Sequence, residues 1–294
     1  MKTGVVEDSS FSYSDCVIIT GCSSNHVLSA LNMILSAVLA DVYAPIVFVD
    51  YGIDMNYYKP INEVFNAIHS IYQSVSSSAN VYYRKFNFAN FPSWFNISDP
   101  NTRGGYSWKI VSLFDVLMET KRIVVWSDGG NLFNYDFVDA LERVYKYGAY
   151  SPYSAGTIGQ WVHASANQFL GSHKMVKRIL LGRNMCNGAL LMFDYNHDEV
   201  MNSIVFPLVQ CAYTQKCISP QGTSRKNHRQ DQAIVSVLMQ SVYVNESCHG
   251  AYKSNVFVHR DCDKMDTCKN TRSFVVNNII RYFPNSLHLD FSDW

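Results

Sequence analysis

The sequence has little charge, and its positive and negative charges balance. Asp, Glu, Lys and Arg make up 16% of the 294 residues, and the 24 basic and 24 acidic residues cancel. An average domain carries about a quarter of charged residues. No basic run exceeds a few residues. Because general nucleic-acid binding needs a basic face, this composition argues against a nucleic-acid partner.

Long hydrophobic runs are also lacking. No apolar stretch reaches the length that spans a bilayer, so no transmembrane segment is expected in this chain. Residues 1–14 are polar and acidic, which is unlike a signal peptide. Apolar residues still make up 48% of the chain, enough for a substantial core.

Cysteine is too scarce for a disulfide scaffold, but its spacing is uneven. Two pairs are six residues apart, namely Cys211 with Cys217 and Cys262 with Cys268. Asn96 and Asn245 each begin an N-glycosylation acceptor pattern. Disulfides persist in oxidising compartments. These features indicate the lumen of the secretory pathway (Golgi or ER) if an anchor has been removed, and the cytoplasm remains the alternative.

Several standard nucleotide and catalytic motifs are missing. The first strand is not followed by G-x-G-x-x-G, which argues against a dinucleotide dehydrogenase. No G-x-x-x-x-G-K-[ST] occurs, so a P-loop enzyme is not expected. No G-x-S-x-G occurs either, which argues against an esterase-type nucleophile.

The hydrophobic pattern alternates between strands and helices. Short β-rich apolar runs predict strands at 16–22, 46–50, 81–86, 122–126, 189–193 and 255–259. Spacings of three and four predict helices at 26–42, 60–75, 107–119, 134–147, 198–212 and 231–241. This alternation predicts an α/β fold with a mainly parallel central sheet flanked by helices. We expect one domain over residues 1–294, with a nucleotide-binding half at about 15–130 and an acceptor half after it.

Polar residues follow the predicted strands at the edge where a parallel sheet binds ligands. Ser24 and Asn25 follow the first strand, Asp50 ends the second, and Asp128-Gly129-Gly130 follows the fourth. A carboxylate in a glycine-rich turn can hold a divalent cation beside a diphosphate. Asp128 is equally compatible with an ordinary turn. Asp50 could form a hydrogen bond to the ribose or to the base of a nucleotide.

Ordered segments in this chain resemble the GT-A (nucleotide-diphospho-sugar) glycosyltransferases, whose fold is Rossmann-like. The segments are SDGG at 127–130, NGALLMF at 187–193, HRQDQ at 228–232 and a late strand ending in a histidine. Four shorter segments are more narrowly similar to an uncharacterised eukaryotic glycosyltransferase-like family: SSNH at 23–26, VDYG at 49–52, YSWK at 106–109 and WSD at 126–128. The resemblance covers about residues 16–260. It implies transfer of a hexosyl or pentosyl group from a nucleotide-sugar to a glycan, glycoprotein or other hydroxyl acceptor.

The same resemblance implies roles for particular residues. Asp231 would be the base of an inverting reaction, although it is also placed to cap a helix. Asn187 and Gly188 would contact the donor sugar. Lys109 and Arg229 would pair with the donor diphosphate, or else be solvated surface cations.

A metal ion, Mn²⁺ or Mg²⁺, is implied by the resemblance, with Asp128 and His259 as its ligands. The typical D-x-D motif would supply two carboxylates, and Gly130 replaces the second one here. We therefore expect weaker metal dependence than in enzymes with both acids.

Three other interpretations stay open. The missing carboxylate is compatible with a catalytically inactive GT-A-like binding protein. Soft ligands at Cys248, His249, His259, Cys262 and Cys268 could hold zinc, although they lack the C-x₂-C pairs of structural zinc sites. A methyltransferase would use an acid after the second strand but also a glycine-rich first turn, which is absent.

Overall fold

The computed structural model describes residues 15–75, 77, 79–99, 102–134, 137–171, 178–242 and 256–257. A six-stranded sheet in the order β3-β2-β1-β4-β9-β6 forms its centre. The strands of this sheet are β1 (Cys16–Cys22), β2 (Ile46–Asp50), β3 (Val81–Lys85), β4 (Ile123–Ser127), β6 (Ala149–Tyr150) and β9 (Leu190–Asp194). β3, β2, β1 and β4 are parallel, whereas β9 is antiparallel to β4 and β6. The expected Rossmann-like α/β fold class is confirmed.

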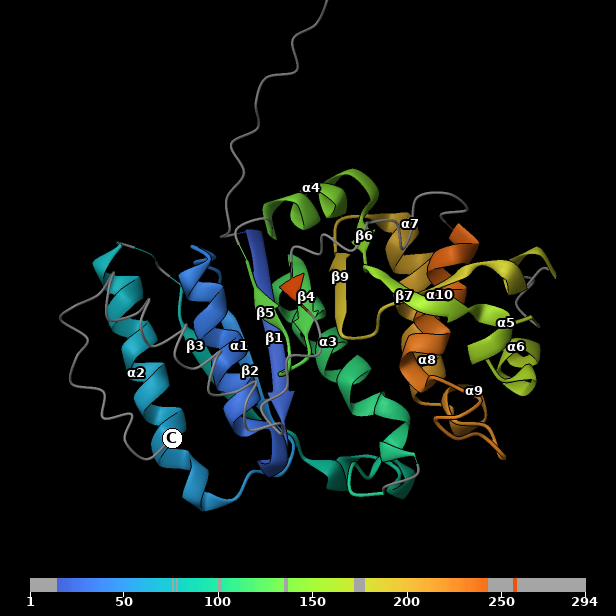
Figure 1. Ribbon diagram of the computed structural model, residues 1–294, viewed down its shortest axis with the longest axis horizontal. Coiled ribbons are helices and arrows are strands. Elements are labelled where there is room, and N and C mark those ends of the chain that lie inside the picture. The colour runs from blue at the N-terminus through green and yellow to red at the C-terminus, as the bar shows by residue number, and fades with distance from the viewer. Residues whose placement is uncertain are drawn as a thin grey trace, which may run out of the picture.

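Helices cover both faces of this sheet (Figure 1). The longer ones are α1 (Val27–Leu39), α2 (Tyr58–Ser74), α3 (Ser107–Thr120), α4 (Phe137–Tyr147), α6 (Ala164–Gly171), α8 (Phe206–Ala212) and α10 (Gln230–Val242). Short pieces complete the described chain: β5 (Leu132–Phe133), β7 (Tyr153–Thr157), β8 (Asn184–Cys186), β10 (Val256–Phe257), α5 (Ile158–Trp161), α7 (Asp198–Val200) and α9 (Gln215–Ile218). None of the helices in the described ranges is long and apolar enough to cross a membrane.

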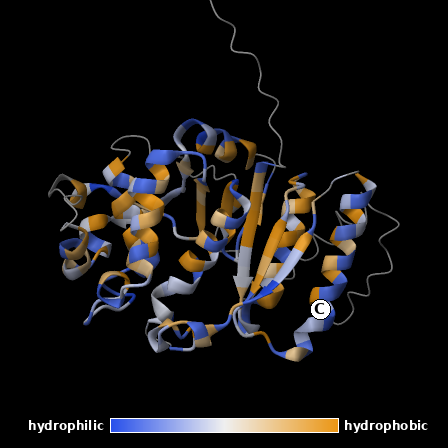
Figure 2. Cartoon of the chain, turned by 180° about the vertical axis from the view of Figure 1, so that it is seen from behind, coloured by the Kyte–Doolittle hydropathy of each residue, from blue (hydrophilic) through white to orange (hydrophobic). Residues whose placement is uncertain are grey.

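The inner strands β1, β2 and β4 are apolar on both sides because both sides are buried. In β1, Val17 and Ile19 belong to the core cluster that includes α3, α8 and α10. Ile18, between them, belongs to the cluster that includes α1, α2 and α4. Figure 2 shows the hydrophobic character of the central strands and of the helix surfaces against them. Continuous apolar runs are typical of parallel strands covered on both faces.

The second half departs from the predicted pattern. No strand is predicted at 153–157, but these residues form β7, which pairs with β8 in a separate two-stranded sheet. The predicted helix 198–212 contains a π-helical turn at Met201–Val205. The pairing of β7 with β8 joins segments that are distant in the sequence, which local periodicity does not report. The predicted strand at 255–259 appears as β10, paired with β5, over the two residues described there.

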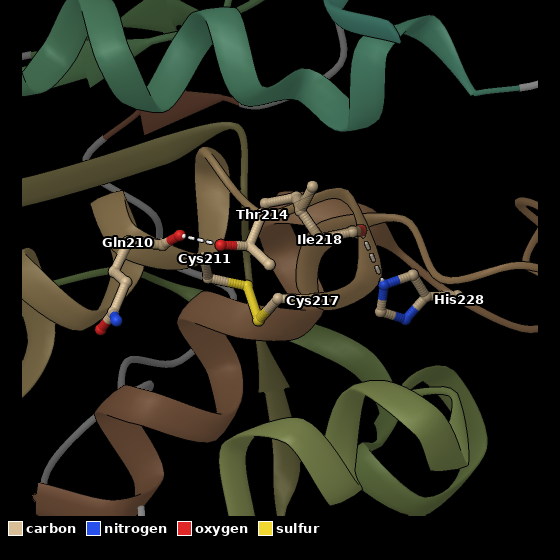
Figure 3. The surroundings of a disulfide bond; sticks show 6 residues. All are labelled: Gln210, Cys211, Thr214, Cys217, Ile218 and His228. Atoms are coloured by element: carbon tan, nitrogen blue, oxygen red, sulfur yellow. Dashed lines mark hydrogen bonds between the residues drawn. A yellow bond between two sulfur atoms is a disulfide. The ribbon is translucent and has the colours of Figure 1, made fainter. Parts of the chain in front are cut away.

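Cys211 and Cys217, which are six residues apart in the sequence, form a disulfide. Figure 3 shows this bond joining α8 to α9, next to His228. Cys186 is also disulfide-bonded. Cys262 and Cys268, the sequon at Asn245 and the residues of the alternative zinc site lie outside the described residues.

Candidate active site

A cavity of about 520 Å³ opens at the carboxyl ends of β1, β2 and β4. We call it the strand-end cavity. Its sheet side is lined by Gly21, Asn25, Gly52, Asp128 and Gly129. The structure thus brings together the turns that follow the first, second and fourth strands, as the parallel sheet predicts. Of the predicted site residues, Asn25, Asp128 and Gly129 lie on this cavity.

The strand-end cavity is also lined by residues that were not among the predicted site residues. They include Arg103, Tyr106 and Arg225. Arg225 donates a hydrogen bond from its guanidinium to the Tyr106 hydroxyl, and its guanidinium carbon lies 5.8 Å from the centre of the Tyr106 ring. Two arginines, Arg103 and Arg225, therefore line this cavity together with glycines at the strand ends.

The backbone of the Arg103–Tyr106 segment is unusual. All four residues have positive φ: 46° at Arg103, 63° at Gly104, 59° at Gly105 and 57° at Tyr106. A Cβ on Gly104 would lie 2.1 Å from the carbonyl oxygen of Phe95, so a side chain does not fit there. Left-handed backbone costs a non-glycine residue roughly 1–2 kcal/mol, and such strain is concentrated at functional sites. The glycine doublet Gly104-Gly105 was the signal in the sequence that could have marked this turn.

Lys109 lies at the centre of a buried charge cluster. Its ammonium group is 2.8 Å from the Asp231 carboxylate and 3.2 Å from that of Asp128, and it donates a 3.0 Å hydrogen bond to the carbonyl of Gly188. The Lys109 side chain is 4% exposed, and those of Asp231 and Asp128 are 5% and 35% exposed. Lys109, Asp128, Gly188 and Asp231 were all predicted site residues, and the fold brings them into contact.

Burial and pairing act in opposite directions in this cluster. Burial alone would lower the pKa of Lys109, but the Asp128 and Asp231 charges raise it above its usual value. Burial raises the pKa of Asp231, against the effect of the Lys109 ammonium. Two carboxylates share one ammonium, so one negative charge of the cluster has no positive partner within it.

Asp231 was expected to cap a helix or to act as a base. α10 begins at Gln230, so Asp231 lies in the first turn of the helix, and its side chain contacts Lys109. It lines neither of the two cavities described for this region. The preceding Gln230 has a φ of 44°, a third left-handed non-glycine residue near the cluster. The base role would require the Asp231 carboxylate to reach an acceptor hydroxyl.

Asn187 and Gly188 form a tight turn before β9. The Asn187 side chain accepts a 2.8 Å hydrogen bond from the Ala189 amide. A Cβ on Gly188 would lie 3.0 Å from the Gln232 Cβ and 3.5 Å from the Asp231 carboxylate. The absence of a side chain at Gly188 therefore lets α10 approach this turn.

Ser24 and Asp50 hold the loops together beneath the strand-end cavity. The Ser24 hydroxyl accepts from the Asp54 amide at 2.9 Å. Asp50 is fully buried, and its carboxylate accepts hydrogen bonds from the amides of Gly52 and Ile53 and from the Tyr83 hydroxyl. A ribose contact by Asp50 would require this turn to open, so Asp50 is not part of the donor site proposed below.

A second cavity of about 750 Å³ lies between β7, α5 and the start of α10. We call it the lateral cavity. Arg229, expected at the donor diphosphate, lines this cavity and stacks on Trp161, with its guanidinium carbon 4.1 Å from the ring centre. Arg225 lines both cavities and so stands between them.

His228 anchors the loop that carries Arg225 and Arg229. Its ring accepts a hydrogen bond from the His163 amide at 3.2 Å. The other ring nitrogen lies 3.0 Å from the Ile218 carbonyl oxygen (Figure 3). This pair of contacts assigns the neutral ring, with its proton on Nε2 facing the carbonyl. Burial lowers the pKa of His228 to about 4.

We expect this histidine to make the fold sensitive to acid. The pKa of His228 is lower in the folded chain than its ordinary value of 6.5, so its stabilising effect is complete above about pH 6.5 and is lost as pH falls toward about 4. The free energy of unfolding should fall by about 3 kcal/mol from this residue between pH 7 and pH 4. Urea denaturation across this range should show a weaker pH dependence for His228→Asn than for wild type. His69→Asn, an exposed change on α2, should leave the dependence unaltered. Equal pH dependence in wild type and His228→Asn would contradict the assignment.

The side chains of the described residues do not by themselves form a site for a divalent metal ion. The described residues contain no group of three or more His, Cys, Asp or Glu side chains that could hold one. One Asp128 oxygen, Oδ1, accepts from the Trp126 indole at 2.6 Å and is the oxygen that faces Lys109. His259, the other expected ligand, lies outside the described residues.

No protein-family model and no curated protein sequence matches this chain. Solved structures of glycosyltransferases are similar to it at low identity. WbbM, a bifunctional glycosyltransferase, is 13% identical with a TM-score of 0.48, and the match covers 82% of this chain but 39% of WbbM. An active-site mutant of LgtC is 14% identical with a TM-score of 0.47, covering 79% of this chain and 71% of that one. Mouse xyloside xylosyltransferase 1 is 10% identical with a TM-score of 0.45, covering 79% and 84%.

These likenesses, all below a TM-score of 0.5, do not identify the chemistry of this chain. The narrower similarity to a eukaryotic glycosyltransferase-like family is not shown by any of them.

Proposed function

We propose that this protein transfers a sugar from a nucleotide-diphospho-sugar to a hydroxyl acceptor. The observation that carries this proposal is the strand-end cavity, which is lined by two arginines and by glycine-rich turns at the carboxyl ends of parallel strands. Such cavities are the usual ligand sites of open α/β sheets. Arginine is well suited to phosphate because its N–H donors pair with two oxygens at once.

The donor diphosphate lies between Arg103 and Arg225 in this proposal. The leaving diphosphate gains negative charge when its bond to the sugar breaks, and preorganised cations stabilise that charge. Asp128, on the sheet side of the cavity, is held by Trp126 and Lys109 and is available to a hydroxyl of the donor sugar.

The acceptor approaches from the lateral cavity. Its oxygen forms a bond to the anomeric carbon, the bond from that carbon to the diphosphate oxygen breaks, and the diphosphate leaves with the bonding electrons. In the inverting form of this proposal, Asp231 takes the proton of the acceptor hydroxyl. Its raised pKa strengthens it as a base. Because it lines neither cavity, this role requires a local opening near Arg225 when the substrates bind.

Nucleoside diphosphate binding tests the donor site. Calorimetric titration with UDP, GDP and ADP should show binding of at least one of them, and Arg103→Gln should weaken it by roughly tenfold or more, since hydrogen bonds to charged groups contribute about 1.5–3 kcal/mol. Arg143→Gln, on α4 at the opposite edge of the sheet from the cavity, should leave the affinity unchanged (Figure 1). Absence of binding by every nucleotide would overturn the proposal. Binding without turnover of any nucleotide-sugar would instead favour an inactive binding protein.

Metal removal should have a small effect on this reaction. The guanidinium groups already supply the positive charge that a divalent ion would bring, and Asp128 alone offers one carboxylate. We expect donor hydrolysis in EDTA to retain most of its rate. Complete loss in EDTA, restored by Mn²⁺, would show that a further ligand such as His259 completes a metal site.

A further inference from the structure

The lateral cavity carries positive charge without matching negative charge. Arg225, Lys226 and Arg229 line it, and the described residues of its lining include no Asp or Glu. None of these three side chains forms an ion pair with a carboxylate in the described part of the chain. Asp231, adjacent in sequence to this group, is buried and paired with Lys109.

Aromatic rings hold the two guanidinium groups of this cavity in place. Arg229 stacks on Trp161, and the Arg229 amide also donates to the Trp161 carbonyl at 3.1 Å. Arg225 contacts the ring and hydroxyl of Tyr106. Stacking on a ring face orients a guanidinium group while its N–H donors stay available in the ring plane. Burial lowers the pKa of Arg229, and the nearby charge of Arg225 lowers it further.

The donor does not account for this charge. Arg225 borders both cavities, but Lys226 and Arg229 line the lateral cavity and not the strand-end cavity. The diphosphate is already matched by Arg103 and Arg225. Lys226 and Arg229 are therefore two further cations on the side from which the acceptor enters.

Neutral polar groups surround these cations. Gln160, Gln232 and Ser154 line the same cavity, and part of each glutamine amide is used internally. The Gln160 side-chain oxygen accepts from the Thr157 amide, and the Gln232 side-chain nitrogen donates to the Cys186 carbonyl. The nitrogen of Gln160 and the oxygen of Gln232 remain for a ligand with hydroxyl groups.

We propose that the acceptor is a sugar or polyol that carries an anionic group (phosphate, sulfate or carboxylate), and that Lys226 and Arg229 bind this group in the lateral cavity. The inference rests on the proposed function, because only glycosyl transfer makes this ligand an acceptor. Binding of the anionic sugar can be measured without turnover. Lys226 and Arg229 select the substrate, and neither touches the reacting atoms.

Direct binding of small probes tests the proposal. Glucose 6-phosphate, glucose 6-sulfate, glucuronate, glucose and inorganic phosphate are titrated into the full chain by calorimetry. At least one anionic sugar should bind roughly tenfold or more tightly than glucose, because a charge-assisted hydrogen bond adds at least that much affinity. The double variant Lys226→Gln/Arg229→Gln should lose this preference. Raising the salt concentration should weaken the binding of the anionic sugars and leave the binding of glucose unchanged.

A matched control removes one cation elsewhere. Lys59→Gln alters an exposed residue of α2, at the other end of the molecule from α5 and α10, and should leave every probe unaffected (Figure 1). Equal binding of glucose and of all the anionic sugars would overturn the proposal. So would an unchanged preference in the double variant, or inorganic phosphate binding as tightly as glucose 6-phosphate, which would indicate a simple anion site.

Nucleotide binding separates this inference from the proposed function. If UDP, GDP or ADP binds but anionic sugars bind no better than glucose, only the proposal of an anionic acceptor is overturned. If anionic sugars bind as expected but no nucleotide binds, the anion site in the lateral cavity is supported and the proposed glycosyl transfer is overturned. Donor affinity should be the same in wild type and in the double variant, since Lys226 and Arg229 do not line the strand-end cavity.

Discussion

Replacing Lys109 with methionine is expected to lower the free energy of unfolding by about 3–5 kcal/mol, the usual cost of removing one partner from a buried ion pair. Methionine fills a similar volume, so the packing loss is small. The change would leave the Asp128 and Asp231 carboxylates without the ammonium that lies 3.2 and 2.8 Å from them. Asp231, which is almost completely buried, would then have to be protonated or become exposed to water.

Urea denaturation of Lys109→Met and of the double variant Lys109→Met/Asp231→Asn measures this effect. The double variant removes the buried negative charge together with its partner, so it should recover part of the lost stability. A double-mutant cycle gives the coupling between the two side chains directly. A Lys109→Met protein within about 1 kcal/mol of wild type would contradict the pairing, because a surface ion pair contributes no more than that.

The sequence predicted the frame of the site because that frame follows from local pattern and sheet geometry. Apolar runs identified β1, β2 and β4, and parallel strands must present their carboxyl ends at one edge. Asn25, Asp128 and Gly129 follow these strands and line a shared cavity. Lys109, Gly188 and Asp231 were singled out by the resemblance to a family, and their mutual contacts are a finding of the structure.

What the sequence could not predict depends on contacts between distant segments. Arg103 and Arg225 face one cavity because a left-handed turn and a long loop meet there, 122 positions apart, and no local pattern encodes that meeting. Asp50 looked like a ligand contact at a strand end, but its carboxylate is used by the turn that it starts. A polar residue at a strand end can either contact a ligand or stabilise the following turn. Its hydrogen-bond partners in the structure show which of the two it does.

Replacing Asp231 with asparagine is expected to reduce turnover by about 10²–10⁴-fold, the contribution of a general base. Asparagine keeps the shape of the side chain but cannot take a proton. Donor affinity should barely change, because the Asp231 carboxylate contacts Lys109 and not the cavity in which the diphosphate is placed. Turnover and nucleotide affinity should be measured on the same preparation, with urea denaturation as the check on folding.

Two other results would assign Asp231 differently. An Asp231→Asn variant with turnover and stability near wild type would show that the carboxylate charge is dispensable, and would contradict both the base role and the importance of the pair with Lys109. A folded variant that loses donor binding would place Asp231 under the donor site, acting through Lys109 and the Gly188 carbonyl that Lys109 holds. That result would favour a retaining reaction, in which this position orients the sugar and no protein base takes the acceptor proton. The stereochemistry of the product, read by NMR from wild-type protein, should then be retained, whereas the base role requires it to be inverted.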